Sequence, residues 1–264
     1  MRRGWLAVWV CLFALSSLVS AQTASNAVTK DPQAVSILTQ SLRAVDTSLA
    51  LSGLQDYSGT GTITFNWPGE QSPVPVIVRG MGLTNFRLDA SLPDGMRTYA
   101  VSNYSGIVIS QNGSRNTASG PNLFTAGSLT IPSFRAASVL TDTTTSITTT
   151  GISTWSGQQE YKVHCVSTLY TPQSGKNGPQ NFGVFDLYID PSTFFVVALV
   201  ETIYANSNIN APVVHELDFS SYGLFGGLEV PLAVTEKVNG QTTWSINLTS
   251  VSFNNGFSTA EFTP

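Results

Sequence analysis

The sequence predicts an α+β protein: one highly curved antiparallel β-sheet of about ten or eleven strands, covered by an N-terminal helix and a short helical insertion. Three observations support this fold class. One stretch near the N-terminus has the apolar spacing of a helix, most of the chain after residue 57 alternates with the period of a strand, and turn residues recur at short intervals. A sheet of this size must curl to bury its apolar face, because so few helices are present to cover it.

The composition limits the possible function classes. Only 11% of the residues are charged, less than half the roughly 25% of an average soluble domain, whereas Ser and Thr make up 62 of the 264 residues. The formal net charge is −4, so the chain lacks the excess of positive charge that a nucleic-acid-binding protein needs. Its 42% hydrophobic residues are enough to build a core, which argues against disorder.

Residues 1–21 are predicted to be a signal peptide. Arg2 and Arg3 give a positively charged start, an apolar run follows, and small residues precede a cleavage site between Ala21 and Gln22. The apolar run is too short to span a bilayer convincingly, and no later stretch approaches about 20 apolar residues. The sequence therefore predicts a periplasmic or secreted protein.

The first element of the mature chain is predicted to be a helix over residues 31–51. Asp31 is a suitable N-cap, and Pro32 occupies the first helical position, where proline is favoured. Gly53 is placed to end the helix in a left-handed conformation. The apolar residues then recur at intervals of three and four: Val35, Leu38, Leu42, Val45 and Leu49. A stripe of this kind has to pack on an apolar surface.

Alternating strand patterns begin at Tyr57 and continue to the end of the chain. The clearest turns are Asp190–Thr193, which suits a type I turn, and Asn239–Gly240, which is the strongest hairpin signal. The alternation breaks over residues 116–142, which could form one or two short helices. Because no domain boundary is visible, residues 22–264 are predicted to form a single domain.

The sequence contains no convincing catalytic or metal-binding pattern. His164 and Cys165 are adjacent in a predicted strand and so point to opposite faces, and no second histidine follows His215 at the spacing of a metalloprotease. Asp186 and Asp190 are too far apart along a strand for a glycosidase pair. The sequence therefore predicts no enzyme, no cofactor and no metal site. Cys165, the one cysteine beyond the leader, is predicted to be a buried core thiol.

Four short segments resemble the periplasmic lipoprotein-carrier (LolA-like) superfamily, and their order and spacing span nearly the whole mature chain. They are Asn85–Asp89, Leu187–Thr193, Tyr222–Pro231 and Val251–Phe257. The resemblance implies a LolA-like open half-barrel whose concave apolar face, lidded by helices, holds acyl chains or another lipid-like ligand. It does not imply that this protein carries lipoproteins.

On this interpretation the candidate ligand-binding residues lie on the first four predicted strands. Arg87 is the one charged residue in an otherwise apolar segment. It could face solvent on the convex side, or it could lie at the pocket mouth and bind a lid segment or an anionic headgroup. The candidates are Phe65, Trp67, Val76, Val78, Phe86, Arg87, Leu88 and Tyr99.

The function predicted from these observations is that of an exported, monomeric, non-enzymatic protein that binds a lipid or an acylated lipoprotein, as a carrier or an envelope sensor. Transient membrane contact is compatible with this function, and nucleic acid is not an expected partner. The alternative is an envelope or secreted interaction module built as a filled β-sandwich without a ligand cavity. The low charge and the Thr-rich strands fit that alternative equally well.

Overall fold

The computed structural model describes residues 28–46, 50–103, 105–118, 123, 126–167, 183–205 and 208–263. The predicted signal peptide therefore lies outside the described residues. Within the described part of the chain, no helix has the length and apolar character needed to cross a bilayer.

The described strands form one sheet of 13 strands, and every neighbouring pair is antiparallel. In chain order they are β1 (Asp56–Phe65), β2 (Val74–Met81), β3 (Asn85–Leu92), β4 (Gly95–Ser102), β5 (Ser105–Ile109), β6 (Arg115–Ala118), β7 (Thr145–Trp155), β8 (Gln158–Ser167), β9 (Val184–Ile189), β10 (Val196–Ala205), β11 (Asn208–Phe225), β12 (Leu228–Val238) and β13 (Gln241–Phe253).

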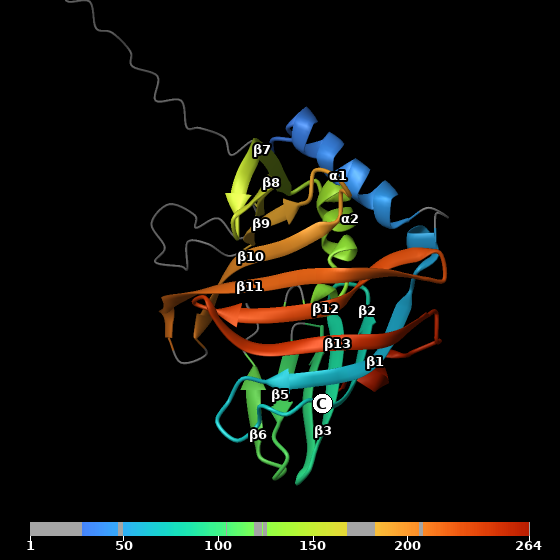
Figure 1. The fold of residues 1–264 in the computed structure, drawn as a ribbon, viewed down its shortest axis with the longest axis vertical. Helices are drawn as coiled ribbons and strands as arrows, with labels where there is room; N and C mark the ends of the chain where they lie inside the picture. Colours follow the sequence, from blue (N-terminus) through green and yellow to red (C-terminus); the bar gives the residue numbers. More distant parts are fainter. Residues whose placement is uncertain are drawn as a thin grey trace, which may run out of the picture.

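The sheet consists of two meanders joined at β1 and β13. Its spatial order is β6-β5-β4-β3-β2-β1-β13-β12-β11-β10-β9-β8-β7, so β6 and β7 form its two edges and the sheet is not closed. In Figure 1, β2 and β3 run at a steep angle to β11 and β12, as strong twist and curvature require. The predicted curved antiparallel sheet is confirmed. The strand number exceeds the prediction, partly because β6 pairs with β5 across the turn at Asn112–Gly113.

Helix α1 (Pro32–Val45) begins where the sequence predicts. The Asp31 carboxylate accepts a hydrogen bond from the backbone N–H of Ala34 at 2.8 Å, and Pro32 occupies the first turn. Along its buried side the helix packs on α2 (Ser133–Thr141) and on strands β7, β8 and β12 (Figure 1).

The helix is shorter than the predicted range of residues 31–51. It ends at Val45 because the next residue, Asp46, forms an isolated antiparallel bridge with Leu228 at the start of β12. The Asp46 carboxylate also accepts the backbone N–H of Leu51, the second residue of the short 3₁₀ turn η1 (Ala50–Gly53). Leu49, the last residue of the predicted apolar stripe, lies outside the described residues.

The predicted helical insertion is present as a 3₁₀ turn, η3 (Ala126–Ser128), followed by α2. It is fixed to the concave face of the sheet by Tyr57. The hydroxyl of this buried residue donates to the carbonyl of Gly127 at 3.1 Å and hydrogen-bonds with Thr130 at 2.8 Å. Gly127 approaches the β2–β3 turn so closely that a Cβ atom there would lie 2.2 Å from the carbonyl oxygen of Gly82.

The two halves of the sheet have separate cores on the concave side. In the β7–β12 half, α1 and α2 provide apolar side chains such as Leu38 and Val139, which pack with Leu187 and others from the strands. In the β1–β5 half, the insertion itself packs on the sheet, around Tyr57 and Phe86. The second core contains the candidate functional site.

Candidate ligand-binding site

A cavity of about 310 Å³ lies between the concave face of the sheet and the helical insertion. One wall comes from β1, β3, β4 and β5, the opposite wall from β10 to β13, and the cover from the insertion. Most of the lining is apolar or aromatic: Ile63, Phe65, Trp67, Phe86, Leu88, Tyr99, Val108, Leu123, Ala126, Leu129, Ile203 and Trp244. Such a lining suits an apolar ligand.

Strand alternation places these side chains in the cavity. Leu88, Tyr99 and Val108 are direct cross-strand partners on β3, β4 and β5, so they lie on one face of the sheet. Their neighbours Arg87 and Asp89 point to the opposite, convex face. The result is a continuous apolar wall across three strands.

The structure brings together five of the eight predicted ligand-binding residues and separates the other three from the cavity. Phe65, Trp67, Phe86, Leu88 and Tyr99 line it. Val76 and Val78 face the same side but are core residues, 2% and 0% exposed, and do not line the cavity. Arg87 lies on the convex face.

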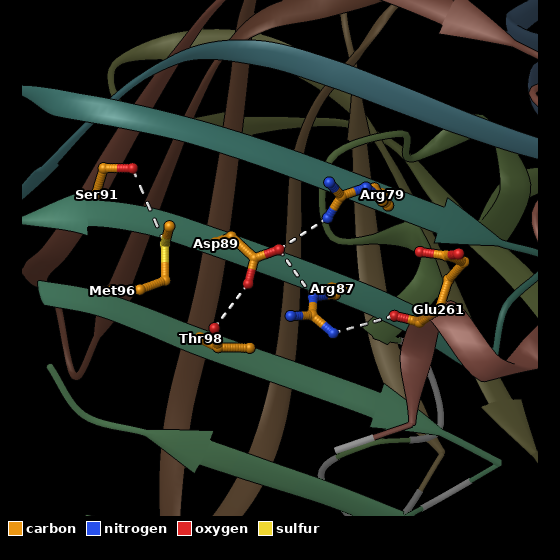
Figure 2. Close-up of polar contacts among 7 residues, drawn as sticks. All are labelled: Arg79, Arg87, Asp89, Ser91, Met96, Thr98 and Glu261. Carbon is orange, nitrogen blue, oxygen red and sulfur yellow. Dashed lines mark hydrogen bonds and ion pairs between the residues drawn. The ribbon is translucent and has the colours of Figure 1, made fainter. Parts of the chain in front are cut away.

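Figure 2 shows the surroundings of Arg87. Its Nε donates to the carboxylate of Asp89 at 2.8 Å, and its Nη1 donates to the backbone carbonyl of Glu261 at 3.3 Å. Arg79 and Thr98 also donate to Asp89, at 2.8 and 2.6 Å. Burial opposes ionisation of Asp89, but these donors outweigh it and lower the pKa of the carboxyl. Arg87 therefore fastens the C-terminal segment to the outer face of β3.

A second arginine, Arg97, stands in the cavity wall close to Trp67, which is 43% exposed. The guanidinium forms a bidentate pair with Glu70, with N–O distances of 2.6 and 2.8 Å, and donates to Gln111 at 2.9 Å. It also lies 4.6 Å from the ring centroids of both Phe65 and Trp67. The hydrogen bonds from Arg97 lower the pKa of Glu70. Arg97 is thus held in a fixed position by four partners.

The other charged side chains of the described lining form a row of three on neighbouring strands. His215 on β11 lies between Glu201 on β10 and Glu236 on β12, with Nδ1 3.1 Å from the first carboxylate and Nε2 3.0 Å from the second. Thr243 donates a hydrogen bond to the other oxygen of Glu236. Burial disfavours the imidazolium, but the two carboxylates outweigh burial and raise the pKa of His215 to about 10.

The sequence pattern does not predict this row. Glu216, the next residue after His215, lies on the other face because side chains alternate along a strand, and its carboxylate accepts a hydrogen bond from Lys237 at 2.7 Å. Glu201 and Glu236 meet His215 only through the register of β10, β11 and β12. The sequence alone shows these three residues in separate predicted strands and does not show that the strands are neighbours in this register.

The other chemically reactive residues lie away from the cavity. Cys165 is buried as predicted, and burial raises the pKa of its thiol to about 12. His164 lies on the outer face, 2.6 Å from Asp186, and Asp190 accepts hydrogen bonds from the turn residues that follow it. Among the described residues, no group of three or more His, Cys, Asp and Glu side chains is arranged to hold a metal ion.

No family model matches the sequence, and no curated protein matches it. Solved structures do. A putative outer membrane lipoprotein-sorting protein domain from Vibrio parahaemolyticus is 11% identical with a TM-score of 0.54, covering 87% of this chain and 96% of that one. A LolA superfamily protein from Nitrosomonas europaea is 10% identical with a TM-score of 0.51, covering 88% and 97%.

A third similar structure is a DUF1329 family protein from Desulfovibrio piger, 13% identical with a TM-score of 0.50, covering 87% of this chain and 97% of that one. At such low identities the likeness concerns the fold. The chain has a LolA-like fold, as the four sequence segments predicted.

Proposed function

We propose that this protein is an exported, non-enzymatic binding protein that holds the apolar chain of a lipid or an acylated lipoprotein in the cavity beneath the helical insertion. The observation that carries the proposal is the cavity itself. Its volume of about 310 Å³ falls at the lower end of the range of about 300–1,000 Å³ for small-molecule sites, and its lining is predominantly apolar.

Burial of methylene groups would supply the affinity. Each one transferred from water to the cavity contributes about 0.8 kcal/mol, so a chain of several carbons is needed for useful binding. The aromatic residues Phe86 and Tyr99 form part of the wall, with ring centroids 6.1 Å apart. The half-buried Trp67 beside the cavity gives an aromatic surface with a polar N–H, which suits contact with a lipid headgroup.

Two further considerations support the proposal. The structure from Vibrio parahaemolyticus is described as a lipoprotein-sorting domain, and its fold is similar to this one. The predicted signal peptide is consistent with a protein that works outside the cytoplasm. The alternative of a filled β-sandwich is not favoured, because the described strands belong to one sheet with a cavity on its concave side.

Displacement of a fluorescent probe tests the proposal. N-phenyl-1-naphthylamine, an uncharged probe, should bind the mature protein with a stoichiometry of one and should be displaced by medium-chain amphiphiles. Val108→Trp, which fills the cavity from β5, should weaken probe binding about tenfold or more. Ile107→Trp is the matched control, since its side chain lies on the same strand but on the opposite face.

Two outcomes would contradict the proposal. One is a mature protein that binds neither the probe nor any lipid, including by native mass spectrometry after expression in a lipid-containing host. The other is equal probe binding by the Val108→Trp variant and the wild type, which would place the probe outside the cavity.

A further inference from the structure

We propose that the ligand is an amphiphile whose head group carries no negative charge and donates hydrogen bonds, such as a hydroxyl or an ammonium group. The inference rests on the proposed function, because it concerns the same cavity. It comes from the polar residues of the lining. Binding of an apolar chain alone does not explain why charged side chains line the cavity.

Four described charged side chains line the cavity: Arg97, Glu201, His215 and Glu236. Both positively charged groups among them are already held by carboxylates. The guanidinium of Arg97 is bound bidentately by Glu70, and the imidazole of His215 has a carboxylate oxygen within about 3 Å of each ring nitrogen. A carboxylate or phosphate head would have to compete with a carboxylate that is already bound to either positive group.

Negative charge also opposes such a head directly. The row of Glu201, His215 and Glu236 places two carboxylates in the cavity lining, one on each side of the imidazole. Their side chains are only 13% and 20% exposed, so repulsion of an anion is weakly screened by water. An uncharged or positive head avoids this repulsion.

Two side chains of the lining that are partly buried carry a polar group with no hydrogen-bond partner among the described residues. One is the hydroxyl of Tyr99, whose pKa is raised by burial and further by the nearby charges of Glu236 and Glu201. The other is the indole N–H of Trp244. A hydroxyl head could accept a hydrogen bond from either group and donate its own proton to a carboxylate oxygen, whereas an ammonium head can donate to several acceptors at once.

A matched series of ten-carbon amphiphiles tests the inference. Decanol, decylammonium and decanoate share a chain length and differ in the charge of the head at pH 7.5. Each is titrated against the mature protein carrying bound N-phenyl-1-naphthylamine, and the inhibition constants are compared. We expect decanol and decylammonium to compete at least about tenfold more strongly than decanoate, which corresponds to about 1.4 kcal/mol.

Two variants test whether the polar row causes the difference in inhibition constant between decanol and decanoate. Glu236→Gln removes one negative charge and should reduce the ratio between decanol and decanoate toward unity. Glu261→Gln is the matched control, because this exposed side chain belongs to the segment on the convex face and should leave the ratio unchanged (Figure 2). The Glu236→Gln variant must still bind the probe, which shows that its fold and cavity are intact.

The outcomes separate the inference from the proposed function. If the probe binds and decanoate competes as well as or better than decanol, the inference is wrong and the binding function stands. If the ratio between decanol and decanoate is the same in Glu236→Gln as in the wild type, the polar row does not cause the preference and the inference is wrong. If the probe does not bind at all, the proposed function itself fails.

Discussion

His215 is a buried residue whose environment differs strongly from that of a free side chain. It is 5% exposed and has a carboxylate oxygen near each ring nitrogen, and the pKa of its imidazole rises from 6.5 to about 10. A folded-state pKa above the unfolded value means that the folded protein binds the proton more tightly. The resulting stabilisation is fully present below pH 6.5 and is lost as the pH rises toward 10.

This linkage predicts a pH-dependent stability. Within that range the slope reaches about 1.4 kcal/mol per pH unit for one proton, so the wild type should lose roughly 2 kcal/mol more than His215→Gln between pH 7 and pH 9. Urea denaturation at several pH values measures this difference in slope. Thr263→Ala, which changes an exposed side chain that does not titrate, should retain the wild-type slope. Equal slopes for His215→Gln and the wild type would show that the buried imidazole is not protonated in this range.

At the residue scale, the sequence predicted the apolar part of the site but not its polar part. Phe86 and Leu88 could be placed on one face because strand alternation is local. The sequence leaves the face of Arg87 open and includes this residue among the ligand-binding candidates, whereas the structure places it on the convex face with the C-terminal segment as its partner. The row around His215 depends on three strands being neighbours in register, which is information that no single strand contains.

At the scale of elements, the C-terminal segment is the least expected feature. After β13 the chain crosses the convex face, where the Asp56 carboxylate accepts the backbone N–H groups of Asn255, Gly256 and Phe257 at 2.6, 2.9 and 3.0 Å. The segment ends in the 3₁₀ turn η5 (Thr259–Phe262), which packs on β3 and β4. Phe262 is completely buried there.

Phe262→Ala should therefore destabilise the whole protein. Loss of a fully buried Phe costs about 3–5 kcal/mol, and the value at the lower end is expected because a terminal segment can relax. Urea denaturation measures the loss, and Thr263→Ala, an exposed neighbour, is the control. Probe binding at low denaturant should be unchanged, since the cavity lies on the opposite face. A stability equal to that of the wild type would mean that the segment contributes no packing energy.

Elements with a strong local signal were predictable, and those that depend on distant partners were predicted less well. The helix start at Asp31 and the hairpin at Asn239–Gly240 follow from capping and turn chemistry. The end of α1 does not, because Asp46 leaves the helix to pair with Leu228, which is far away in the sequence. The short strand β6 exists only as a partner of β5.

At the scale of the molecule, the two cores have different consequences for stability. The helices pack on the concave side of the β7–β12 half, whereas the cavity lies between strands of the β1–β5 half and part of β10 to β13. An apolar ligand in the cavity would add packing contacts with its lining. A ligand that binds only the folded protein should therefore stabilise the chain as a whole, by mass action.

The size of this effect can be predicted. At a free ligand concentration of 100 times Kd the stabilisation is about 2.7 kcal/mol, which for a chain of this length corresponds to a rise in Tm of about 5–10 °C. Scanning calorimetry of the mature protein with decanol measures the rise, which should increase with the logarithm of ligand concentration. The Ile107→Trp variant should show the same rise as the wild type, and Val108→Trp should show almost none, since its indole already fills the space. A rise in Val108→Trp equal to that of the wild type would mean that decanol stabilises the protein from a site other than this cavity.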